Sequence, residues 1–144
     1  MNKEKSCGAV IYTIKNNRIY FLLSKMGLGH ISLTKGHIEE SESEKETAER
    51  EILEETSLSP EIDTNFRKVI TYSPKKDVIK DVVFFVAKLK EEKKPKDLHD
   101  DEVVGFIWAE YPKAIKKLTF ESDKEVLKDA YVYILKKELN NGKF

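Results

Sequence analysis

GHIEESESEKETAEREILEETSL, which runs from Gly36 to Leu58, is the stretch of sequence that decides the fold. Its predicted helix carries Glu51, Glu54 and Glu55 on one arc of roughly 100°, because each residue advances the helix by about 100°. Like charges at this spacing repel one another by a few tenths of a kcal/mol per pair. A divalent cation would reverse the sign of that interaction, and carboxylate oxygens suit a hard ion such as Mg²⁺. The segment therefore predicts a helix that holds metal.

Length and composition set the outer bounds. The 144 residues suit one domain, residues 1–144, with its own core. The 26 basic and 26 acidic side chains cancel, so no bulk field attracts nucleic acid or anionic membrane. Cys7 is the only cysteine, which excludes an intrachain disulfide and favours a reducing compartment. The start has no apolar signal region, and the longest apolar run, Val82–Ala87, is far shorter than the roughly 20 residues of a membrane span. A cytoplasmic protein is expected.

Segments rich in β-branched and aromatic residues predict the strands. They are Gly8–Thr13, Arg18–Ser24, Phe66–Tyr72, Lys80–Leu89 and Val103–Ala109. Between them, Met26–Thr34 is predicted as a loop, Ser73–Asp77 as a turn and Glu91–Asp101 as a polar surface loop.

The helix inside the deciding stretch has two alternative N-terminal capping boxes. Ser41 with Glu44 and Ser43 with Glu46 both fit the Ser-x-x-Glu pattern. The helix is expected to end near Thr56.

Two further helices are predicted near the C-terminus. Pro112–Leu118 indicates a short helix with proline in its first turn. Ser122–Glu125 fits another capping box, which would open a long helix to about Leu139. Together the elements predict an α+β layer fold with helices on a mixed sheet.

The spacing within the deciding stretch resembles the box of the Nudix hydrolases. That box reads Gly-x5-Glu-x7-Arg-Glu-U-x-Glu-Glu-x-Gly-U, where U is a bulky aliphatic residue. Gly36, Glu42 and the run from Arg50 to Leu58 match every defined position except the last glycine, which is Ser57 here. A solvated, charge-rich helix explains neither the spacing nor the grouped carboxylates.

The resemblance implies an α/β/α sandwich with a mixed sheet, in which the box forms a loop–helix–loop. It also implies Mg²⁺, or Mn²⁺ in its place, bridging a diphosphate that water attacks at phosphorus. Glu51 and Glu55 would be metal ligands, and Glu54 would be the general base and a further ligand. Arg50 and Glu42 would pair to brace the loop, with a simple surface ion pair as the alternative.

Other segments look like one branch of that family, the asymmetrical diadenosine tetraphosphate hydrolases, which release ATP and AMP. The similar segments are Ser6–Tyr12, His30, Lys35–Glu39 and Lys80–Phe85. The usual His-Trp-x-Phe-Pro-Lys is replaced here by His-Ile-Ser-Leu-Thr-Lys, and Ser41 replaces a common glycine.

This branch also implies binding roles outside the box. Glu102 matches a late acidic residue that helps bind metal, and Tyr72 and Phe120 fall where two aromatics sandwich an adenine. The alternative for Phe120 is a cap on the core between two helices. Lys35, Lys80 and His30 would contact phosphate; the alternative for each is an ordinary solvated side chain.

The functional expectation is Mg²⁺-dependent hydrolysis of a small dinucleoside polyphosphate by a monomer. Rival substrates are RNA 5′ ends, diphosphoinositol polyphosphates and oxidised nucleoside triphosphates. A rival of a different class is a non-catalytic nucleotide sensor on the same fold, although such modules usually lose the box carboxylates that this chain keeps.

Overall fold

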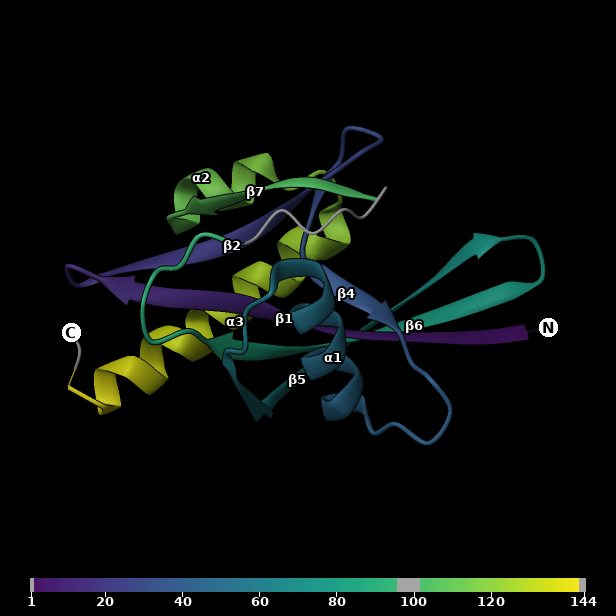
Figure 1. Ribbon diagram of the computed structural model, residues 1–144, viewed down its shortest axis with the longest axis horizontal. Helices are drawn as coiled ribbons and strands as arrows, with labels where there is room; N and C mark the ends of the chain where they lie inside the picture. The colour runs from purple at the N-terminus through teal and green to yellow at the C-terminus, as the bar shows by residue number, and fades with distance from the viewer. Residues whose placement is uncertain (1, 96–101, 143–144) are drawn as a thin grey trace.

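The computed structural model describes residues 2–95 and 102–142, so part of the predicted Glu91–Asp101 loop lies outside the described residues. Four strands precede the first helix, three more strands follow it, and two helices close the described chain (Figure 1). Their order is β1 (Asn2–Lys15), β2 (Arg18–Met26), β3 (Ile31–Ser32), β4 (Thr34–His37), α1 (Glu44–Thr56), β5 (Glu61–Lys75), β6 (Val78–Lys88), β7 (Val103–Ala109), α2 (Tyr111–Lys117) and α3 (Glu121–Asn140).

One mixed sheet is built around β1. Strand β6 runs parallel to β1 along its residues 2–12, and β5 continues the sheet beyond β6. The other side of β1 is shared: β2 pairs with residues 12–15 and β4 with residues 6–9. Strand β2 also pairs with β3 and β7, whereas β4 does not. The sheet therefore divides between β2 and β4.

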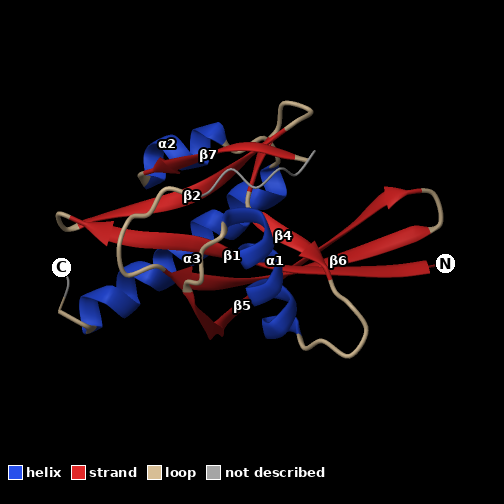
Figure 2. Cartoon of the chain, in the orientation of Figure 1, coloured by secondary structure: helices blue, strands red, loops and turns tan. Residues whose placement is uncertain are grey.

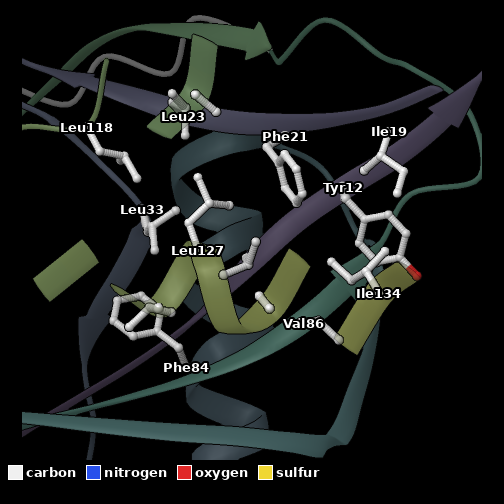
Figure 3. Close-up of a cluster of buried hydrophobic side chains, with 14 of the residues drawn as sticks. Tyr12, Ile19, Phe21, Leu23, Leu33, Phe84, Val86, Leu118, Leu127 and Ile134 are labelled. Carbon is white, nitrogen blue, oxygen red and sulfur yellow. The ribbon is translucent and has the colours of Figure 1, made fainter. Parts of the chain in front are cut away.

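Helices cover both faces of this sheet (Figure 2). Alternate residues of β1 enter two different cores, because successive strand side chains point to opposite faces. Tyr12 packs with Leu127 and Ile134 of α3 (Figure 3), and Val10 belongs to the same core, whereas Ile11 joins the core beneath α1. The predicted α/β/α sandwich with a mixed sheet is confirmed.

The box helix begins and ends close to where the sequence predicts. Ser43 is its N-cap and forms the capping box with Glu46, which decides between the two alternatives. Its last residue is Thr56, and the following Ser57 has φ 63° and ψ 10°. Serine thus adopts the left-handed conformation for which the Nudix box normally supplies glycine.

Several predicted boundaries were wrong. Strand β1 begins at Asn2, where its pairing with β6 starts, and β5 begins at Glu61, whereas Gly8 and Phe66 were the predicted starts. Helix α3 begins at Glu121 with Phe120 as N-cap, so the Ser122–Glu125 capping box does not form. Hydrogen bonds between Thr119 and Ile31 fix the chain just before the helix and set this earlier start. The predicted loop Met26–Thr34 contains β3 and the start of β4, and strand β5 continues through most of the predicted turn. Within the described residues, no helix combines the length and apolar character that crossing a membrane requires.

Candidate active site

A cavity of about 240 Å³ opens where the sheet divides. Five of the predicted site residues line it, and they come from β4, α1, β6 and the segment before β7. They are Lys35, Gly36, Glu55, Lys80 and Glu102. A larger hollow of about 630 Å³ lies between β6 and the end of α3, and none of the predicted site residues lines it. The smaller cavity is therefore the candidate site, because it gathers acidic and lysine side chains.

Gly36, the first residue of the box, lies against Glu51 of the box helix α1. A Cβ atom added there would lie 2.0 Å from Cδ and 2.1 Å from Oε2 of Glu51. The Glu51 carboxylate thus packs directly against the backbone of β4, and a side chain at position 36 would displace it. This close approach is the physical reason for glycine at the start of the box.

Arg50 ties the loop before α1 to the helix, as predicted. Its Nε donates to Oε2 of Glu42 at 2.6 Å, and its Nη2 donates to Oε1 of Glu42 at 3.1 Å and to the His37 carbonyl at 2.8 Å. The Glu39 amide also donates to Glu42, at 2.9 Å. The hydrogen bond from Arg50, followed by the one from Glu39, lowers the pKa of Glu42 to about 2. The Arg50–Glu42 pair therefore braces the loop against the helix, and the alternative of a simple surface ion pair is wrong.

The same guanidinium also lies between the helix carboxylates, whose mutual repulsion was expected to require a divalent cation. Nη1 of Arg50 donates to Glu51 Oε1 at 2.8 Å and to Glu54 Oε2 at 3.2 Å. A positive charge therefore already offsets part of the repulsion among the helix carboxylates. Burial raises the pKa of Glu51, and the bond from Arg50 opposes that rise.

The metal site remains a prediction. Among residues 2–95 and 102–142, no three acidic, histidine or cysteine side chains stand close enough together to hold an ion. The chemistry of the donor set nevertheless fits a hard divalent cation, since Glu55 and Glu102 present only oxygen donors to the cavity. The backbone beside Glu102 is fixed, because its carbonyl accepts from the Gly27 amide at 2.7 Å.

Two lysines line the cavity, from the two strands that flank β1. Lys35 of β4 lies opposite Gly8, and Lys80 of β6 lies opposite Glu4. Burial, and then the charge of Lys35, lower the pKa of Lys80. The two ammonium groups therefore sense each other, as expected of a pair that shares one anionic ligand.

The predicted aromatic pair lies at the surface. Tyr72 is 41% exposed and Phe120 is 46% exposed, so Phe120 does not cap the core. The His30 ring lies 5.3 Å from the Phe120 ring, centroid to centroid. Tyr72 lies opposite Lys80 across the β5–β6 ladder, which places it next to the cavity. His30 and Phe120 thus form one group, and Tyr72 and Lys80 form another.

Sequence reasoning missed two buried residues near the site. Asp123, which the capping-box reading assigned to a helix start, is 4% exposed and accepts from the Leu33 amide at 3.4 Å. Burial raises the pKa of Asp123, and burial followed by the charge of Asp123 raises the pKa of Tyr72. Ser6 is 1% exposed and lines the cavity. A single serine in a strand carries no signal that pattern reasoning can use.

This arrangement of a carboxylate helix, a divided mixed sheet and a cavity with two lysines defines a class of protein. The family model of the NUDIX domain matches residues 5–130. The chain therefore belongs to the Nudix family.

Several relatives within that family are similar to this chain over most of its length. The asymmetrical bis(5′-nucleosyl)-tetraphosphatase of Rattus norvegicus is 27% identical over 141 residues, covering 90% of this chain and 95% of that protein. The Sus scrofa enzyme of the same name is 28% identical over 147 residues, with the same coverage. The crystal structure of a C. elegans Ap4A hydrolase binary complex has a TM-score of 0.82 and 26% identity, covering 92% of this chain and 98% of that one. The resemblance drawn from the residues is confirmed.

Proposed function

We propose that this protein hydrolyses dinucleoside polyphosphates, and that diadenosine tetraphosphate is its preferred substrate, cleaved to ATP and AMP. The observation that carries the proposal is the cavity that gathers Glu55, Glu102, Lys35 and Lys80 from four separate parts of the chain. Acidic oxygens for a cation beside lysines for an anion are what a metal-bound phosphate anhydride requires. The names of the relatives supply the particular substrate.

In this proposal Glu51, Glu54, Glu55 and Glu102 hold Mg²⁺, with Mn²⁺ as the alternative ion. The chemistry that such an ion supplies is neutralisation of developing oxyanion charge and acidification of water. Glu54 takes the proton of the attacking water. Its side chain is 58% exposed, and Arg50 stands 3.2 Å from its Oε2, so the carboxylate is held in place and open to solvent.

Other side chains hold the substrate. Lys35, Lys80 and His30 contact the phosphate chain as fixed positive or hydrogen-bonding groups. Tyr72 and Phe120 stack on the adenine, and each base–aromatic contact is worth about 1–3 kcal/mol. The exposed Tyr72 ring, opposite the cavity-lining Lys80, favours a nucleoside end over an inositol ring, which offers no π face.

Hydrolysis of diadenosine tetraphosphate in ¹⁸O-water, with mass analysis of the products, tests the assignment. We expect ATP and AMP, with turnover lost in Glu54→Gln. Glu49→Gln is the matched control, because Glu49 is an exposed residue of the same helix. A product pair other than ATP and AMP would remove the substrate assignment, and full turnover in Glu54→Gln would remove Glu54 as the base.

A side-by-side panel separates the rival substrates. Capped RNA, a diphosphoinositol polyphosphate and an oxidised nucleoside triphosphate should each give a lower kcat/KM than diadenosine tetraphosphate. Nucleotide binding without cleavage of any of them would favour the non-catalytic sensor.

A further inference from the structure

Ser6 carries an unpaired hydroxyl group inside the cavity. Within the described parts of the chain, its Oγ is the one buried side-chain nitrogen or oxygen atom that has no hydrogen-bond partner. The residue is 1% exposed and lines the cavity. An unsatisfied buried hydroxyl costs stability, so it requires a functional or structural explanation.

The register of the sheet places Ser6 between the two lysines. On β1, Glu4 lies opposite Lys80 and Gly8 lies opposite Lys35, and Ser6 is the residue midway between them. Alternate residues of a strand share a face, and directly paired residues point to the same side of the sheet. Residues two apart along a strand are separated by about 7 Å. Ser6, Lys35 and Lys80 therefore share one face of the sheet and line the same cavity.

This cavity suits an anion with several oxygen atoms. Burial, and then the charge of Lys35, lower the pKa of Lys80, whereas the charges of Glu4 and Glu102 act in the opposite direction. A serine hydroxyl can donate one hydrogen bond and accept two. A phosphate oxygen would accept a hydrogen bond from the Ser6 hydroxyl while lying between the two lysines.

We infer that Ser6 is a substrate-positioning residue, whose Oγ donates a hydrogen bond to a non-bridging phosphate oxygen held between Lys35 and Lys80. The contact deepens the proposed function, since it rests on a polyphosphate ligand. It does not depend on which nucleoside the polyphosphate carries or on whether cleavage follows.

The inference predicts opposite effects of Ser6→Ala on stability and on binding. Removing an unsatisfied hydroxyl should leave the melting temperature of the ligand-free protein unchanged or higher. Losing a hydrogen bond to a charged ligand should weaken polyphosphate binding by about tenfold or more.

Thr13→Val is the matched control. Thr13 lies on the same strand and is fully buried, but its hydroxyl already donates to the Leu89 carbonyl at 2.7 Å. This variant should lower the melting temperature and leave polyphosphate affinity unchanged.

The probe is inorganic tripolyphosphate, titrated calorimetrically into the full chain in EDTA, with adenosine as the ligand that lacks phosphate. We expect saturable tripolyphosphate binding that Ser6→Ala weakens. Ser6→Cys should weaken it less than Ser6→Ala does, because a thiol still donates a hydrogen bond, although a weaker one. Adenosine binding should be the same in all three proteins. The inference fails if wild type does not bind tripolyphosphate, if Ser6→Ala binds it as wild type does, or if Ser6→Ala only loses stability.

Two outcomes separate this inference from the proposed function. Tripolyphosphate binding that depends on Ser6, without hydrolysis of diadenosine tetraphosphate, would remove the substrate assignment and support the positioning role. Hydrolysis of diadenosine tetraphosphate to ATP and AMP, with KM and tripolyphosphate binding both unchanged in Ser6→Ala, would support the substrate assignment and remove the positioning role.

Discussion

Gly36→Ala is the change whose consequence follows most directly from the geometry. The new Cβ would lie 2.0 Å from Cδ of Glu51, whereas ordinary contact begins near 3.4 Å, so the carboxylate has to retreat by about 1.4 Å. The displaced atoms are the far end of a flexible side chain, so the fold should survive. A catalytic group misplaced by about 1 Å costs on the order of 100-fold in rate. That loss corresponds to about 2.7 kcal/mol of transition-state stabilisation.

The assay is kcat/KM for diadenosine tetraphosphate over a Mg²⁺ titration, together with the melting temperature. Gly105→Ala is the control, because the nearest atom to its added Cβ is Cδ of Lys25 at 3.4 Å. We expect Gly36→Ala to lose about 100-fold in kcat/KM, with a melting temperature near that of wild type, and Gly105→Ala to match wild type in both. Gly36→Ala with wild-type kcat/KM and wild-type Mg²⁺ dependence would refute the claim that Glu51 acts from this position.

Three other outcomes are expected from single contacts. The pKa of Glu42 is about 2, below its ordinary 4.5, so its stabilisation is complete above about pH 4.5 and is lost as pH falls toward 2. In Glu42→Gln, the free energy of unfolding measured in urea should fall less steeply between pH 4.5 and pH 2 than in wild type. The same pH dependence in both proteins would contradict this expectation. Tyr12→Phe removes a 2.6 Å hydrogen bond to buried Glu138 and should cost about 1–3 kcal/mol in denaturant unfolding without changing kcat. Tyr72→Ala and Phe120→Ala should each raise KM by about 5- to 150-fold if they lose about 1–3 kcal/mol of stacking; an unchanged KM would exclude the base clamp.

Local patterns predicted the parts of the structure that local interactions determine. The N-cap and the end of α1 depend on hydrogen bonds within a few residues, so the sequence predicted the end near Thr56 and narrowed the cap to Ser41 or Ser43. The start of α3 does not, because Thr119 is held by Ile31, from a strand far away in the chain. Likewise, the unpaired Ser6 hydroxyl exists only because β1 is flanked by β4 and β6.

Repulsion among the grouped helix glutamates is weaker evidence for metal than the sequence suggested. Arg50 donates to both Glu51 and Glu54, so these carboxylates can lie together without a metal ion. The stronger argument comes from Glu55 and Glu102, which the fold brings from distant segments to one cavity that also holds Lys35 and Lys80. Helical spacing does not produce that convergence, and a purely structural ion-pair network would not need to leave a cavity between the acids and the lysines. The division of the sheet beside β1 creates that space, so the topology, more than the charge count of the helix, supports a phosphate-binding metal site.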